Sequence, residues 1–216
     1  KLNRGTSEGK CARIGSHFHK GGACLMATRR DGPYVWVTWL AKLMTGEVSC
    51  EWASWYRTHH TDIQKVPSDF DQAGWQMDHT RALRDARVER QDVGEELFVE
   101  RQNYFQWERP NSTLVLAGTP DLITIGSEYV RIYDIKTGQP RQSHQVQVMI
   151  YMHCLRSMAP VYREKLLHGA VRYEDHQLDI PLTAIDDSFV RNFDYYLDVL
   201  ESPEPALKLP SESECR

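Results

Sequence analysis

The sequence lacks long apolar runs and a secretory leader. No stretch approaches the roughly 20 consecutive apolar residues that a membrane-spanning helix needs. The polar residues 1–10 contain no apolar segment of the kind that a signal peptide carries. We therefore expect a cytoplasmic protein that does not associate with membranes.

A strong excess of charge of one sign is also missing. The formal net charge is -4 and 26% of the residues are charged, which excludes a basic nucleic-acid-binding tail and a disordered acidic segment. Nucleic acid is not excluded as a ligand, because phosphate contact needs only a local basic groove. With 216 residues and 41% apolar content, the chain can bury one substantial core, which favours a single α/β domain.

Cysteine is scarce and irregularly spaced. Five cysteines, an odd number, are scattered along the chain, which is not typical of a disulfide framework. We expect reduced thiols or a metal site. The cysteines are Cys11, Cys24, Cys50, Cys154 and Cys215.

The domain organisation follows from composition. Residues 1–32 are rich in Gly, Lys, Arg and Ser and predict a flexible lead-in, and the Pro-rich residues 203–216 predict a tail. Between them, residues 33–202 form one domain, with a helical region over 33–93 and a core over 94–202. No internal repeat and no low-complexity tract interrupts it.

Hydrophobic periodicity predicts the elements of this domain. Aromatic residues within 34–56 recur at helical spacings and suggest core helices, and a helix over 70–91, capped by Asp69 or Asp71, turns Trp75, His79 and Leu83 inward. Three sequential strands should then form an antiparallel meander. The predicted core elements are a strand over 97–107, its return strand over 114–117 continued by 121–125, a strand over 129–135, a helix over 140–157, strands over 166–173 and 177–181, and a helix over 183–200.

The most informative feature is a set of charged residues on two of these strands. Pro120-Asp121 is followed, after twelve residues, by Asp134-Ile135-Lys136. Alternation along a strand puts Asp134 and Lys136 on the same face. Carboxylates in this arrangement suit Mg2+ or Mn2+, which prefer oxygen ligands. Such a metal polarises a phosphoryl group and acidifies bound water, while the lysine orients that water and stabilises developing negative charge.

A salt bridge between Lys136 and either aspartate is the simpler alternative. An isolated Asp-x-Lys triplet occurs by chance and usually marks an exposed ion pair. Both aspartates here lie in apolar, strand-like runs, where an unpaired carboxylate is costly to bury. Buried charges of this kind are usually paired or bind metal.

Several motifs in order resemble the RecB-type branch of the PD-(D/E)XK nucleases, which includes recombination-complex nuclease domains and CRISPR adaptation exonucleases. The motifs are Gly118-Thr119-Pro120-Asp121, Asp134-Ile135-Lys136-Thr137-Gly138 and Gln147-Val148-Met149-Ile150-Tyr151. The resemblance implies a restriction-endonuclease-like α/β core with a mixed sheet of four to five strands flanked by helices. It further implies metal ligation by Asp121, Asp134 and the Ile135 carbonyl, and catalysis by Lys136. Gln147 and Tyr151, one helical turn apart, would contact DNA or order the site.

The same resemblance suggests further site residues. That branch places a metal-binding histidine on an upstream helix in a Gly-x-x-x-His pattern, and His79, five positions after Gly74, is displaced from it by one. His79 is our candidate ligand, with a hydrogen-bonded core histidine as the alternative. Glu100 is a candidate for assisting the site, or a surface ion pair.

Some members of that branch hold an iron-sulfur cluster with four cysteines. Cys50 and Cys215 stand where the first two ligands would be, so a cluster is expected only in a longer form of the chain. The alternative is a small buried hydrophobe at Cys50 and an idle thiol at Cys215. His17, His19, His59 and His60 lack metal-ligand spacings and receive no role.

A basic stripe accompanies His79 on its helix. Arg81, Arg84, Arg87 and Arg90 recur every three residues and suggest either phosphate contact or a solvated face, since acidic residues interleave with them.

The sequence as a whole predicts a metal-dependent nuclease that hydrolyses DNA, an exonuclease in DNA processing, repair or defence. The alternatives are an RNA or branched-DNA nuclease, and a non-catalytic DNA-binding or assembly subunit of a larger DNA-processing complex. Buried carboxylates beside a lysine argue against a pure scaffold.

Overall fold

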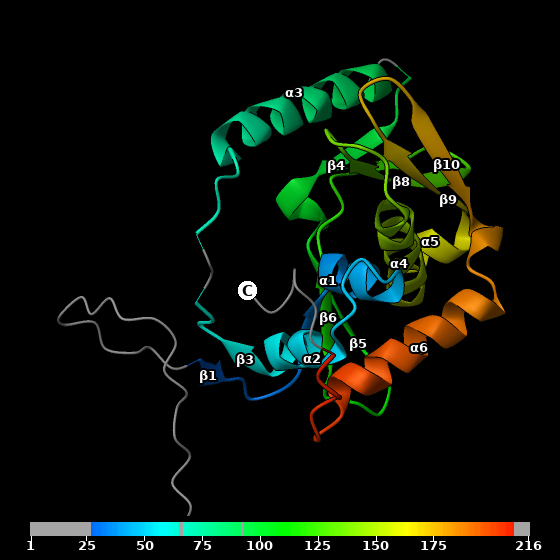
Figure 1. Ribbon diagram of the computed structural model, residues 1–216. Coiled ribbons are helices and arrows are strands. Elements are labelled where there is room, and N and C mark those ends of the chain that lie inside the picture. The colour runs from blue at the N-terminus through cyan, green and yellow to red at the C-terminus, as the bar shows by residue number, and fades with distance from the viewer. Residues whose placement is uncertain (1–26, 65–66, 92, 210–216) are drawn as a thin grey trace, which may run out of the picture.

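A five-stranded mixed sheet organises the computed structural model, which describes residues 27–64, 67–91 and 93–209 (Figure 1). The strand order is β10-β9-β8-β7-β4, and helices flank the sheet, so the expected fold class is confirmed. The strands are β4 (Glu96–Val99), β7 (Leu122–Ile125), β8 (Tyr129–Ile135), β9 (Leu166–Arg172) and β10 (Gln177–Pro181).

Mixed pairing in this sheet follows from its connections. β7 pairs antiparallel with both β4 and β8, and β9 pairs antiparallel with β10. β8 runs parallel to β9, because helix α4 (Gln142–Met158) carries the chain back across the sheet between them. Six residues separate the end of β8 from α4. Gln147 in the second turn of α4 contacts Asp134 near the end of β8.

The expected single strand over 97–107 is wrong, because the chain changes sheets within it. β4 is followed by a short 3-10 helix, η1 (Glu100–Asn103), and then by β5 (Phe105–Glu108). Glu100 adopts a positive φ of 44°, a conformation that ends the strand. Asn103 fixes the corner, since its buried amide donates to the carbonyls of Phe98 (2.8 Å) and Pro120 (3.0 Å).

The return strand is divided in the same way. β6 (Val115–Gly118) pairs with β5 and with β2 (Tyr34–Trp36) in a separate three-stranded sheet, whereas β7 belongs to the five-stranded sheet. The antiparallel run in the main sheet is therefore β4-β7-β8. Thr119 and Pro120 carry the chain from one sheet to the other, directly before Asp121.

Helix α3 (Gln72–Gln91) covers one face of the main sheet (Figure 1). The Asp71 carboxylate caps it by accepting the Gly74 N–H at 2.9 Å, as one of the two expected caps. Leu83 and Ala86 are buried against Leu122, Tyr133 and Ile135 of the strands. Trp75 is not in the core as expected: 42% of its surface is exposed, and its ring stacks on that of His79.

Helix α4 covers the opposite face, where Val148 and Met152 pack in the larger core cluster with Ile132. α1 (Val37–Met44) contacts α4 and, with α2 (Glu51–His59), also packs against α6 (Asp187–Glu201). α6 begins later than expected because Asp186 caps it, accepting the Phe189 N–H at 2.8 Å. The shorter elements are β1 (Thr28–Arg29), β3 (His60–Thr61), α5 (Val161–Glu164) and η2 (Leu182–Ala184).

The aromatic residues of the helical region are less buried than expected. Trp55 is in the core and donates its indole N–H to the Ser202 carbonyl at 2.7 Å. Trp36, Trp39 and Trp52 are only partly buried. Helical spacing predicted helices in this region but not which aromatic side chains are buried, because three of these rings are partly exposed.

The structure describes part of the expected lead-in and part of the expected tail. Of the expected lead-in, residues 1–26 lie outside the described residues, while Thr28–Arg29 pairs with β3. Of the expected tail, residues 203–209 form no regular element and 210–216 are not described. Within the described ranges, no helix combines the length and apolarity needed to cross a bilayer.

Close packing of α4 on β9 depends on Gly169. A Cβ atom there would lie 2.4 Å from Val148 Cγ1 and 2.5 Å from Met152 Sδ, and the branched valine cannot move aside easily. We expect Gly169→Ala to lower the free energy of unfolding by about 1 to 3 kcal/mol in denaturant titration. Gly138→Ala is the control, because nothing lies within 4 Å of its added Cβ. Equal stability of the two variants would contradict this packing.

Candidate active site at the ends of β7 and β8

Asp121 and Asp134 stand opposite each other on neighbouring strands. The pairing of Leu122 with Tyr133, continued by one residue, places the two aspartates across from one another. Asp121 also binds the neighbouring strand directly, since its Oδ2 accepts the backbone N–H of Ile135 at 2.6 Å. The expected convergence of the two carboxylates at this strand end is what the fold produces.

Asp134 is the buried centre of a polar network. Its side chain is 2% exposed, and Lys136 Nζ lies 2.7 Å from its Oδ2. This contact is a buried ion pair between the Lys136 ammonium and the Asp134 carboxylate. Gln147 of α4 donates to the other oxygen, Oδ1, at 2.8 Å. The sequence-predicted residues Asp134, Lys136 and Gln147 are therefore in direct contact.

Gln147 and Tyr151 connect this pair to the rest of the fold. The Gln147 amide also donates to Tyr151 Oη at 2.9 Å, and its Oε1 faces Lys136 Nζ at 3.4 Å. Tyr151 in turn donates to the Thr119 carbonyl at 3.4 Å. Their spacing of four residues aligns both side chains on the buried face of α4. This face fixes the orientation of the Asp134 carboxylate and the Lys136 ammonium.

His79 reaches the site from the opposite helix. Its Nε2 lies 3.4 Å from Asp121 Oδ2, and only 10% of its side chain is exposed. Trp75, one turn earlier on α3, stacks on the imidazole with ring centroids 5.3 Å apart. The histidine therefore faces inward, as the helical pattern predicted, and its nearest charged partner is a site carboxylate.

The 3-10 helix η1 holds the backbone at Asp121 in place. The Glu100 N–H donates to the Asp121 carbonyl at 3.0 Å, and Asn103 holds the preceding Pro120 carbonyl. The Glu100 side chain itself is exposed, so this residue supports the site through its backbone. Asn103 was missed in the sequence, where nothing distinguishes a buried asparagine from a turn residue.

Burial and mutual charge perturb the site electrostatically. Burial raises the pKa of the Asp134 carboxyl to about 6, against the opposing effect of Lys136. Burial lowers the pKa of Lys136, but the Asp134 carboxylate reverses this, so the net pKa is raised. The hydrogen bond with Asp121 raises the pKa of His79. A carboxylate that is this costly to ionise favours a nearby cation.

These residues line a cleft of about 810 Å³. It contains Asp121, Asp134, Ile135 and Lys136, together with residues that sequence reasoning did not assign: Trp36, Thr38, Lys42, Phe70, Asp78, Arg141 and His144. His144 lies three residues before Gln147 on α4, and this spacing was a usable signal. The others come from segments remote in sequence, which only the tertiary fold brings together.

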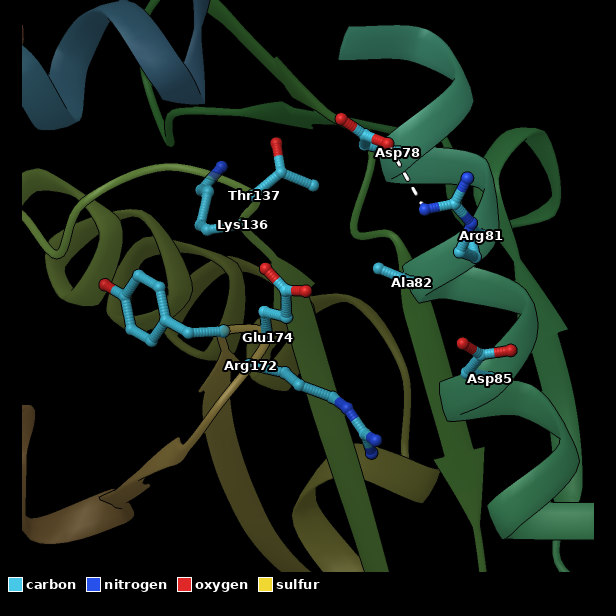
Figure 2. Close-up of a pocket in the computed structure, with 9 residues that line it drawn as sticks. Asp78, Arg81, Ala82, Asp85, Lys136, Thr137, Arg172 and Glu174 are labelled. Carbon is cyan, nitrogen blue, oxygen red and sulfur yellow. Dashed lines mark ion pairs between the residues drawn. The ribbon is translucent and has the colours of Figure 1, made fainter. Parts of the chain in front are cut away.

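A smaller groove of about 220 Å³ continues from Lys136 between α3 and the end of β9 (Figure 2). Arg81 lies on its α3 side beside Asp78, 3.5 Å away, and Arg172 and Glu174 lie on the other. The arginines of the expected basic stripe therefore do not share one environment. Arg81 borders this groove, while the Arg90 guanidinium lies over the Tyr133 ring on the sheet and 3.8 Å from Glu95.

Of the described residues, Cys50, His59 and His60 do not line the cleft. Cys50 is buried at the start of α2, and Cys215 lies outside the described residues, so the iron-sulfur prediction stays a prediction. His59 and His60 contact the carbonyls of Leu200 and Tyr56 and serve the fold. His17 and His19 are also outside the described residues.

The donor set of the cleft fits a hard divalent cation. Two carboxylates and an imidazole line one cleft, and oxygen and imidazole nitrogen ligands suit Mg2+ or Mn2+. As the side chains stand, no group of three His, Cys, Asp or Glu residues in the described ranges is gathered tightly enough to hold a metal. Lys136 and Ile135 N–H occupy the carboxylate oxygens instead.

Comparison with known proteins identifies the superfamily of the chain. The model of the PD-(D/E)XK nuclease superfamily matches residues 12–201, and the chain belongs to that superfamily. A solved structure titled "Crystal structure of SSO0001" is similar at 16% identity with a TM-score of 0.43, covering 81% of this chain and 80% of that chain. No curated protein matches the sequence significantly.

The raised pKa of Asp134 predicts that its ionised carboxylate lowers the free energy of unfolding at neutral pH. Because the folded-state pKa lies above the ordinary 3.8, stability present below about pH 4 is lost as pH rises through about 6. In chelator, we expect Asp134→Asn to match the wild type near pH 4 and to exceed it by about 1 to 3 kcal/mol above pH 7.

Urea titrations across pH measure this difference. Asp187→Asn, an exposed carboxylate at the start of α6, serves as the control and should show no such pH-dependent gain. An Asp134→Asn variant that is less stable than the wild type at pH 7.5 would show that the carboxylate is not under electrostatic strain.

Proposed function

We propose that this protein is a metal-dependent nuclease that hydrolyses DNA phosphodiester bonds. The observation that carries the proposal is the contact between buried Asp134 and Lys136, opposite Asp121, in a cleft at the ends of two strands. Superfamily membership supports nuclease activity in general. A buried carboxylate with a raised pKa beside an amine is typical of a catalytic site rather than a structural one.

Asp121, Asp134, the Ile135 carbonyl and His79 are the proposed ligands of Mg2+ or Mn2+. When bound, such a cation would polarise the scissile phosphate and make water more acidic. Asp134 supplies a carboxylate held in one orientation by Gln147. His79 supplies an imidazole whose position is fixed by Trp75 stacking.

Lys136 is the proposed catalytic lysine. Its raised pKa keeps the ammonium protonated, so it can orient the attacking water and stabilise negative charge on the phosphate. Gln147 Oε1, 3.4 Å from Nζ, limits where the ammonium can point. Tyr151 acts through Gln147 as a positioning residue, since its hydroxyl contacts that amide.

The RecB-type branch is the proposed subgroup, and the Gln147–Tyr151 contact supports it because both motif residues converge on the catalytic pair. We infer a cytoplasmic exonuclease of DNA processing, repair or defence, acting alone or within a larger complex. An iron-sulfur cluster with Cys50 and Cys215 among its ligands is proposed only for a longer form of the chain.

Removing the lysine tests the mechanism. We expect wild-type protein to cleave DNA in Mg2+ or Mn2+ and not in chelator, and Lys136→Ala to lower the turnover rate by about 100- to 1,000-fold. Single- and double-stranded substrates, linear and circular, would be assayed on gels, because circular DNA resists an exonuclease.

Lys208→Ala is the matched control. Lys208 is exposed, lies over Trp52 and borders neither the cleft nor the groove, so its loss should leave turnover unchanged. Cleavage that persists in chelator, or that survives loss of Lys136, would refute the mechanism. Binding without any cleavage would instead favour a non-catalytic subunit.

Loss of the imidazole should weaken metal binding while leaving the lysine in place. We expect His79→Asn to raise the Mn2+ concentration for half-maximal activity by at least about tenfold. His168→Asn, on β9, controls for loss of a histidine in general. An unchanged metal requirement would assign His79 to the fold, as a core histidine paired with Asp121.

A further inference from the structure

A second hollow adjoins the active-site cleft on the far side of α1. It has a volume of about 490 Å³ and is bordered by α1, α2 and the end of α6. Thr38 and Lys42 line both this hollow and the cleft, so the two meet at the exposed face of α1. We refer to it as the α1–α2 hollow. Thr38 and Lys42 therefore form the border that a ligand seated in the cleft would pass to reach the α1–α2 hollow.

The chemistry of this hollow differs from that of the cleft. Its charged lining residues are Lys42 and Arg57, and none of its lining residues is acidic. The cleft next to it contains the carboxylates of Asp78, Asp121 and Asp134. The hollow is therefore positively charged, whereas the adjoining cleft contains carboxylates. A polyanion bound in the cleft would be attracted toward the hollow.

A flat stacking surface lies beside the two cations. Trp39 lines the α1–α2 hollow, and the Arg57 guanidinium lies over its ring, 5.2 Å from the centroid. An indole and a guanidinium plane are both surfaces on which a nucleobase stacks. Trp36, the last residue of β2 and three residues before Trp39, lines the cleft and adds a second aromatic ring near the junction.

A partly buried tryptophan here is not explained by the core. Trp39 packs in neither of the two apolar clusters, unlike Trp55 and Tyr56 of α2. An aromatic side chain beside basic side chains in a groove is typical of proteins that bind single strands, where every base offers a face to stack on. A base-paired duplex hides those faces within its stack.

We propose that the α1–α2 hollow is a subsite for the unpaired nucleotides of a single-stranded polynucleotide, adjoining the cleft. A base stacks on Trp39 beside Arg57, and Lys42 contacts a phosphate at the junction with the cleft. This subsite rests on the proposed nuclease function and deepens it, because it makes a single strand the preferred substrate. DNA and RNA share the required chemistry, so the experiment separates them.

Binding in chelator tests the subsite independently of cleavage. Fluorescence anisotropy would compare wild type, Trp39→Leu and Trp39→Phe on oligo-dT, oligo-rU and a blunt hairpin duplex of equal length. We expect Trp39→Leu to weaken single-strand binding by about fivefold or more, and the aromatic Trp39→Phe to retain most of it. Loss confined to oligo-dT or to oligo-rU identifies the occupant, and either outcome supports the subsite.

An oligonucleotide of abasic residues isolates the stacking contribution. It keeps the phosphates and lacks the bases, so Trp39→Leu should bind it as well as the wild type does. Separately, Lys42→Gln and Arg57→Gln should each reduce the salt dependence of oligo-dT binding by about 0.7 in the log-log slope. Arg191→Gln, an exposed arginine on α6 outside both hollows, should leave that slope unchanged.

Three results would overturn the subsite. They are no single-strand binding by the wild type, unchanged binding by a folded Trp39→Leu variant, and an equal loss on single strand and duplex. Thermal unfolding of each variant establishes that it is folded. Cleavage of DNA by the wild type in Mn2+ is scored in parallel, so an active enzyme with a failed subsite is distinguished from failure of the nuclease proposal itself.

Discussion

The buried Asp134 carboxylate is the constraint on which the site depends. It sits at the end of β8, where ionisation is unfavourable, and three elements converge to hold it there. Lys136 directly follows β8, α4 supplies Gln147, and Asp121, directly before β7, lies opposite. The two helices that cover opposite faces of the sheet each contribute a side chain at this point, His79 from α3 and Gln147 from α4.

Much of this site is encoded locally and was therefore predictable. Period-two alternation put Asp134 and Lys136 on one face, and a four-residue helical step put Gln147 and Tyr151 on another. Asp71, one of two expected caps, accepts the Gly74 N–H at the start of α3. Each of these relations spans fewer than about six residues, so backbone geometry alone fixes it.

The predictions that were wrong concern contacts between residues that are far apart in the sequence. The run over 97–107 has β propensity throughout, but Asn103 binds the Pro120 carbonyl and the chain turns into a second sheet. Trp75 has the right spacing for a core residue and instead lies over His79 at the rim of the cleft. Lys42 and Trp36 reach that cleft from α1 and β2, about eighty residues before the catalytic motif, and no periodicity connects them.

We propose that Asp121 and Asp134 bind one catalytic metal ion. The decisive measurement is a crystal structure grown with Mn2+ and recorded at the manganese absorption edge. We expect one strong anomalous peak within about 2.0–2.4 Å of a carboxylate oxygen of both aspartates, with His79 Nε2 beside it. Manganese bound only to exposed carboxylates, with Lys136 still against Asp134, would contradict it.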